Sequence, residues 1–153
     1  YFARHFGDQL LPREAHFGNT FLRSSCGRAM MWTLRSSPTA RAATVTGLAG
    51  TVRSAAALAR GMSMATGNAA SVTMEGNAVA LANNYPDASA AGIANAINLS
   101  AGDFTFTAGA PAATGTATWQ RVGAATAVTC EVTYTPPAVA GAAPVITAPT
   151  GGC

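Results

Sequence analysis

The sequence has little charge, no lysine and no long apolar run. Only 10% of its 153 residues are charged, although 49% are hydrophobic, whereas charged residues make up about a quarter of a typical soluble protein. A low charge density together with many Thr, Asn and Gly residues is common in secreted β-rich domains and unusual in cytosolic enzymes. The length predicts a single domain with a hydrophobic core of its own.

The positive charge is concentrated at the front of the chain. All nine basic residues are arginine, and residues 1–38 hold five of them against Asp8 and Glu14. The other four arginines are balanced by four acidic residues. A nucleic-acid-binding domain would spread its positive charge over a folded face, so the sequence pI near 9.1 is weak evidence for such a partner.

Histidine is nearly lacking, which bears on catalysis and metal binding. His5 and His16 both lie in residues 1–38, although nucleophile-and-base catalysis needs a histidine beside its nucleophile. Their spacing to Cys26 matches no compact zinc pattern. We therefore expect that the chain is not an enzyme and that it holds no metal and no cofactor. The remaining acidic residues are scattered singly at positions where solvated or capping carboxylates are usual: Glu75, Asp87, Asp103 and Glu131.

A change of character near position 38 divides the chain. Residues 1–38 show no sustained hydrophobic period and predict irregular structure, whereas residues 39–153 predict one globular domain. Pro38 and Thr39 suit a helix start, and small apolar residues then recur at helical spacing on one stripe. This pattern predicts an amphipathic helix that ends at Gly61 and packs lengthwise on a sheet. The stripe consists of Val45, Leu48, Ala49, Val52, Ala56 and Ala59.

Behind this helix the hydrophobic period switches to two. Residues 72–74 and 79–81 alternate around a turn at 75–77, which predicts a hairpin. Trp119 and Tyr134 fall at strand positions, and we interpret them as core or cross-strand packing rather than as ligand platforms. The order of elements indicates an α+β fold with a long N-terminal helix on an antiparallel sheet. Further elements are predicted as a short helix within 88–99, strands at 104–107, 116–122 and 127–135, and an edge strand at Val145 and Ile146.

Cys130 and Cys153 are the two ends of a Pro-rich segment that has 24 residues when both cysteines are counted. A disulfide between them would stabilise the fold by about 3.4 kcal/mol in the chain-entropy model, and it would indicate an oxidising compartment. The alternative is two free thiols, but a terminal Gly-Gly-Cys in a charge-poor chain favours the disulfide. Cys26 is left over, and we interpret it as incidental.

Several segments, taken in order, resemble type IV pilins, in particular those of the mannose-sensitive haemagglutinin type. Ala40 to Ala59 is similar to the second half of the long pilin helix. The ending, from Cys130-Glu-Val-Thr-Tyr-Thr135 to Gly152-Cys153, resembles the disulfide-closed C-terminal region of that group. The resemblance covers about residues 40–153 and includes Val72-Thr-Met-Glu-Gly76, Val79-Ala-Leu81, Asn84-Tyr-Pro86 and Gly92-Ile93.

This resemblance implies a pilin-like fold in which Cys130 and Cys153 close the C-terminal loop. It also implies a structural subunit of an extracellular pilus that serves adhesion, motility or DNA uptake, with other pilin subunits as partners and a host surface or DNA as further ones. Pilins begin with an apolar helix that sits in the inner membrane before assembly. No run of eighteen apolar residues is present in the sequence as given. We therefore expect that this sequence lacks the apolar helix, through which alone the protein would contact the membrane. We expect that it lacks any targeting signal as well.

Two further hypotheses remain open. A pseudopilin of a type II secretion system would share the fold, and a secreted binding module would present its loops to a ligand without polymerising. A small hydrolase is disfavoured because residues 39–153 contain no histidine.

Overall fold

The computed structural model describes residues 37–99 and 102–153. The chain divides into two units, Tyr1–Arg35 and Ser36–Cys153, and all the described residues belong to the second. The predictions for the front segment, including those for His5, His16 and Cys26, therefore lie outside the described residues.

The first described element is a long helix, α2, which spans Pro38–Ala65. The Ser37 side chain caps its start by accepting a hydrogen bond from the Ala40 backbone N–H at 3.2 Å, and Pro38 suits the first turn, where its missing N–H is not needed. The predicted end at Gly61 is wrong. The helix continues to Ala65 because the left-handed glycine that follows its last turn is Gly67, at φ +78°.

The six residues of the predicted stripe on α2 are all buried, with at most 5% of their surface exposed. They are Val45, Leu48, Ala49, Val52, Ala56 and Ala59. The extra turn beyond Gly61 buries Ser63 as well. Small residues predominate on this face of α2, which lets the helix backbone lie close to the strands that it covers.

A small antiparallel sheet lies beside the C-terminal half of α2. The predicted hairpin consists of β1 (Ser71–Met74) and β2 (Asn77–Ala82), paired antiparallel. The turn between them is Glu75-Gly76, both at positive φ, which is typical of a two-residue hairpin loop. A third strand, β3 (Tyr85–Pro86), pairs with the end of β2 and was not predicted from the sequence.

The short helix predicted within residues 88–99 is confined to two brief segments. They are η1 (Ala90–Ala94), a π-helical turn, and α3 (Asn95–Ile97). Gly92 interrupts η1 with a non-helical backbone at φ −95° and ψ −106°. Asn98, in the left-handed region at φ 43°, ends α3 because Asn tolerates this conformation better than most residues do.

The larger antiparallel sheet has the order β4-β5-β6-β7. β4 (Phe104–Thr107) and β5 (Ala117–Arg121) agree closely with the predicted strands, and β7 (Val145–Thr147) is the predicted edge strand. The strand predicted from Ala127 begins only with β6 (Glu131–Thr135). The preceding residues form η2 (Ala127–Thr129), a 3₁₀ turn in which the Cys130 backbone N–H donates to the Ala127 carbonyl at 3.0 Å.

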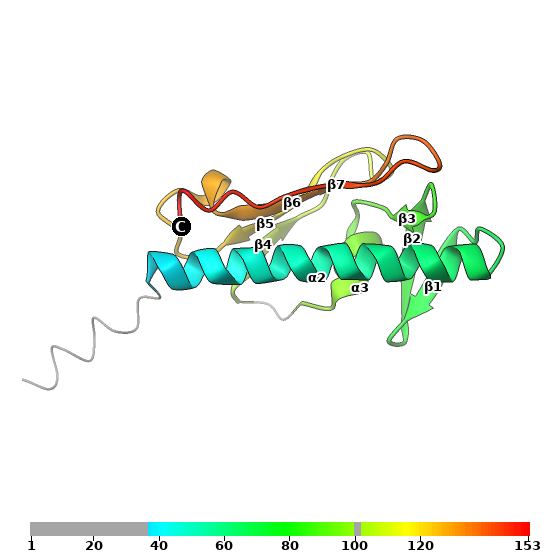
Figure 1. The fold of residues 1–153 in the computed structure, drawn as a ribbon, viewed down its shortest axis with the longest axis horizontal. Helices are drawn as coiled ribbons and strands as arrows, with labels where there is room; N and C mark the ends of the chain where they lie inside the picture. Colours follow the sequence, from blue (N-terminus) through cyan, green and yellow to red (C-terminus); the bar gives the residue numbers. More distant parts are fainter. Residues whose placement is uncertain (1–36, 100–101) are drawn as a thin grey trace, which may run out of the picture. The chain divides into compact units, whose positions relative to one another are not determined.

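The fold is therefore α+β with one long helix packed on antiparallel strands, as the sequence predicted, but the strands form two sheets and not the single predicted sheet. In Figure 1, β4–β7 lie alongside the N-terminal half of α2 and β1–β3 alongside its C-terminal half. The main core cluster joins the helix stripe up to Ala56 to Trp119, Val132 and Tyr134 of the larger sheet. A second cluster joins Ala59 to Val72, Met74 and Val79 of the smaller sheet. No strand of one sheet pairs with a strand of the other within the described residues.

Candidate functional site

The C-terminal segment is closed by the predicted disulfide, which the structure confirms. Cys130 and Cys153 are joined, with their Cα atoms 4.8 Å apart. Cys130 directly precedes β6, and both residues are buried, at 0% and 6% exposure. β7 lies between the two cysteines in sequence and pairs with β6. The disulfide therefore joins the end of the segment that follows β7 to the residue directly before β6.

The turn before Cys130 holds the backbone of the C-terminal segment at Gly152. Gly152 donates its backbone N–H to the Thr129 carbonyl at 3.0 Å and accepts from the Thr126 backbone N–H at 3.0 Å. A Cβ atom at Gly152 would overlap the Thr129 hydroxyl oxygen. The glycine beside Cys153 is therefore required by the close approach of two backbone segments, and its position next to the cysteine was the sequence signal for this contact.

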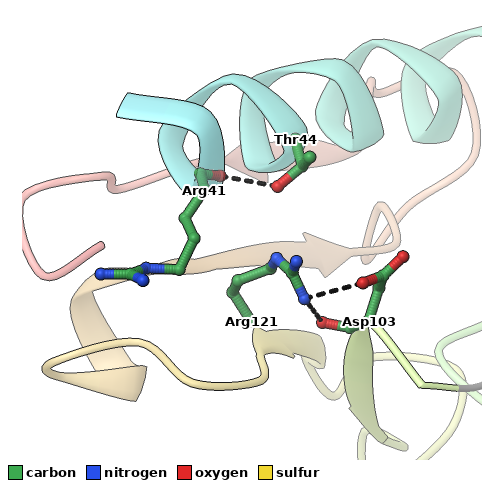
Figure 2. Close-up of polar contacts among 4 residues, drawn as sticks. All are labelled: Arg41, Thr44, Asp103 and Arg121. Carbon is green, nitrogen blue, oxygen red and sulfur yellow. Dashed lines mark hydrogen bonds and ion pairs between the residues drawn. The ribbon is translucent and has the colours of Figure 1, made fainter. Parts of the chain in front are cut away.

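The end of the C-terminal segment also contacts the first turns of α2. Arg41 Nε donates a hydrogen bond to the backbone oxygen of Cys153, and the Arg41 carbonyl accepts from the Thr44 hydroxyl at 2.7 Å. Figure 2 shows Arg41 extending from the helix toward the segment that ends at Cys153. The start of α2, the larger sheet and the disulfide are thus connected in one place, and no local pattern in the sequence predicts this contact.

An ion pair lies beneath the same part of α2. Arg121 of β5 contacts the Asp103 carboxylate at 3.0 Å and donates to the Asp103 backbone oxygen (Figure 2). Its guanidinium also lies over the Phe104 ring, 5.5 Å from the centroid. The Asp103 side chain is 75% exposed, so solvent weakens the ion pair. We interpret the pair as a contact that positions β4 against β5 and not as a catalytic group.

The four acidic residues named from the sequence have different local surroundings. Asp103 is held by Arg121, Asp87 accepts from the Ser89 backbone N–H at 2.9 Å, and Glu131 accepts from Gln120 at 3.0 Å. Glu75 is exposed in the β1–β2 turn. Within residues 37–99 and 102–153, no three His, Cys, Asp or Glu side chains lie close enough to hold a metal ion.

Trp119 and Tyr134 both lie in the core, at 2% and 0% exposure. Trp119 packs on Phe106, with ring centroids 5.1 Å apart, and the Tyr134 hydroxyl donates a 2.6 Å hydrogen bond to the Pro86 carbonyl. Burial raises the pKa of the Tyr134 phenol above its ordinary value, and the nearby Tyr85 and Asp87 raise it further. The phenol therefore stays protonated and links the larger sheet to β3.

A groove that was not predicted from the sequence runs between α2, β3 and β7. Its volume is about 270 Å³, and its lining residues are Arg53, Ala56, Ala57, Tyr85, Pro144 and Ile146. Arg60 fixes one wall, because its guanidinium donates to the Tyr85 hydroxyl and lies 5.0 Å from the centroid of the ring. The groove was missed because its residues come from three distant segments of the chain.

None of the described helices is long and apolar enough to cross a membrane. Comparison with protein-family models, with curated proteins and with solved structures finds no match to this chain.

Proposed function

We propose that residues 38–153 form the head of a filament subunit of the type IV pilin class. The observation that carries the proposal is the combination of the long helix α2, packed lengthwise on antiparallel strands, with a C-terminal loop closed by the Cys130–Cys153 disulfide. These are the two features that the resemblance to pilins implies. In this role the chain acts through packing between copies, and it needs no catalytic group.

The outward face of α2 supports a role in assembly. It carries Gly47, Gly50, Ser54, Leu58 and Gly61, all exposed, where a solvent-facing helix surface usually carries charged residues. Each glycine costs the helix about 1 kcal/mol relative to alanine. A Cβ atom at any of the three would meet nothing within 4 Å in the chain itself, so the fold of a single copy does not require them. A helix packed against those of neighbouring copies would use such a face.

The proposal is tested by restoring an anchor. An apolar pilin N-terminal helix is fused in front of Pro38, and the fusion is expressed in a bacterium that has a pilus assembly system but lacks its own major pilin. We expect fibres in electron micrographs that bind an antibody against residues 38–153. The same strain without its assembly ATPase should produce none.

Two variants sharpen this experiment. Gly50→Glu places a charge on the outward face of α2 and should abolish fibres, whereas Ala113→Glu, on an exposed loop, should leave them intact. A fusion that is exported, folded and oxidised but forms no fibres would contradict the proposal and support the secreted binding module.

A further inference from the structure

The groove beside α2 contains an arginine whose charge is not neutralised within the described residues. Arg53 is exposed and has no hydrogen bond or ion pair among residues 37–99 and 102–153. Arg60, seven residues further along the helix, is already held by Tyr85. The rest of the lining consists of Tyr85, whose hydroxyl is bound to Arg60, and of four apolar residues: Ala56, Ala57, Pro144 and Ile146. Such a groove favours a short acidic group that places its carboxylate on Arg53 and its aliphatic part on the apolar floor.

Among the residues that the structure describes, one carboxylate fits this description. Among the described acidic residues, Asp87, Asp103 and Glu131 are engaged by neighbours in the same chain. Glu75 has no such partner and stands exposed at the tip of the β1–β2 hairpin. A two-residue turn is narrow, so it can enter a groove of about 270 Å³ without moving the strands behind it.

We propose that the Glu75 carboxylate of one copy of this chain enters the groove of a second copy and pairs with its Arg53. The occupant of the groove is thus a second copy of the chain, and the contact identifies two of the surfaces by which the filament subunit meets its neighbour. The inference therefore rests on the proposed function.

The placement of the two surfaces determines the kind of assembly that results. In Figure 1 the β1–β2 turn projects on one side of α2, whereas β3 and β7, which line the groove, lie on the other. The contact joins two different patches, so each copy keeps one tip and one groove available after the first contact. A heterologous contact of this kind extends into a ring or a filament rather than ending at a dimer.

A single contact of this kind is weak. Ion pairs between exposed side chains contribute little because water screens them, and the apolar part of the groove adds only a small burial term. The same contact becomes effective in a filament, where other contacts already hold neighbouring copies at a high effective concentration. The experiment must therefore detect a weak association between separate chains.

The test uses cross-linking between two differently tagged versions of the full chain, both carrying Cys26→Ser. One version carries Ala78→Cys, on the exposed surface of β2 near the tip, and the other carries Ala57→Cys, in the groove. A short bismaleimide should join the two tags in a mixture. Either Arg53→Glu in the groove chain or Glu75→Arg in the tip chain should lower the yield at least fivefold, and both changes together should restore it.

The controls separate this ion pair from a general effect of charge. Glu131→Arg changes the net charge as Glu75→Arg does and should leave the yield unchanged, with thermal unfolding used to verify that each variant is folded. No cross-link with the wild-type charges, or no recovery in the double reversal, would overturn the proposal. If Arg53→Glu lowered the cross-link yield and Glu75→Arg did not, the proposal would also be overturned, and the result would indicate that Arg53 binds an external anionic ligand.

The inference and the proposed function can fail separately. If the anchored fusion forms fibres and the charge reversals change neither the fibres nor the cross-link, the filament subunit stands and this contact is wrong. If the cross-link shows the reversal and recovery while the anchored fusion forms no fibres, the contact stands and the assignment to the pilin class is wrong.

Discussion

Breaking the Cys130–Cys153 disulfide should destabilise the fold by an amount that can be calculated from its position in the chain. The two cysteines are 23 residues apart in sequence, and closing a loop of this size removes unfolded-state entropy worth about 3.4 kcal/mol at 25 °C in the chain-entropy model. This is a large share of the roughly 5–15 kcal/mol that stabilises a typical domain. We expect the reduced chain to remain folded but to lose much of its margin.

The measurement is urea unfolding of the oxidised and the reduced chain, followed by the fluorescence of Trp119 in a Trp32→Phe background. Trp119 is 2% exposed and packs on Phe106, so its emission should change when the core opens. With slopes of about 1–3 kcal/mol per M for small proteins in urea, the midpoint should fall by about 1–3 M. The Cys130→Ala/Cys153→Ala double variant should behave like the reduced chain.

Two results would refute this reasoning. Intact-mass measurement should show a gain of two protons when these cysteines are reduced, and an unchanged mass would mean that the bond does not form. A midpoint that hardly moves after verified reduction would mean that closing this loop removes little entropy from the unfolded chain, contrary to the chain-entropy model.

Three further predictions concern the core and the turns. Leu48→Ala, at a position 5% exposed, should cost about 2–5 kcal/mol of unfolding free energy in denaturant titrations, whereas Leu58→Ala, at a position 56% exposed, should change it by less than about 0.5 kcal/mol. Gly92→Ala should destabilise the fold by about 1–3 kcal/mol because its Cβ would overlap the Asp87 carboxylate and carbonyl oxygens. Gly50→Ala, on the open face of α2, should instead stabilise the isolated chain by about 1 kcal/mol. Shifts in the thermal midpoint of unfolding measure both effects. Tyr134→Phe should cost about 1–3 kcal/mol at pH 7, because the buried Pro86 carbonyl loses its donor. The raised pKa of Tyr134 means that the contribution of its protonated phenol is complete below pH 10.0 and is lost as the pH rises further, so the wild type should lose stability above pH 10.0 more steeply than Tyr134→Phe does.

The sequence predicted those elements whose signals are local. The stripe from Val45 to Ala59 has the helical period over several turns, and the alternation around Glu75-Gly76 has the period of two that a hairpin needs. The disulfide was predicted from two cysteines and a glycine close to the end of the chain. The helix and hairpin patterns each lie in one continuous segment. The disulfide involves two of only three cysteines in the chain, so few other pairings are possible.

The errors arose where a residue's conformation depends on distant contacts. Gly61 suits a helix end, but its backbone remains helical because the next turn still buries Ser63, whose hydroxyl bonds to Ala69 and Asn84. Residues 127–129 alternate like a strand, yet they form a 3₁₀ turn that brings Thr129 to Gly152. β3 is only two residues long and contains a proline, so no periodic pattern can reveal it.

The candidate surfaces show the same limit. Arg53 lies within the continuous segment that forms α2, but the groove beside it also needs Tyr85 and Ile146, which come from other parts of the chain. The free carboxylate of Glu75 likewise becomes informative only when the partners of the other acidic residues are known.

The arrangement of α2 has a mechanical consequence. The helix packs on both sheets, whose strands do not pair with each other among the described residues. A pulling force along the helix axis would therefore load both sheets together in shear, and many small side-chain contacts would have to slip at the same time before either sheet came away. Beside the first turns of α2, the covalent Cys130–Cys153 link would carry tension that hydrogen bonds alone would release one by one.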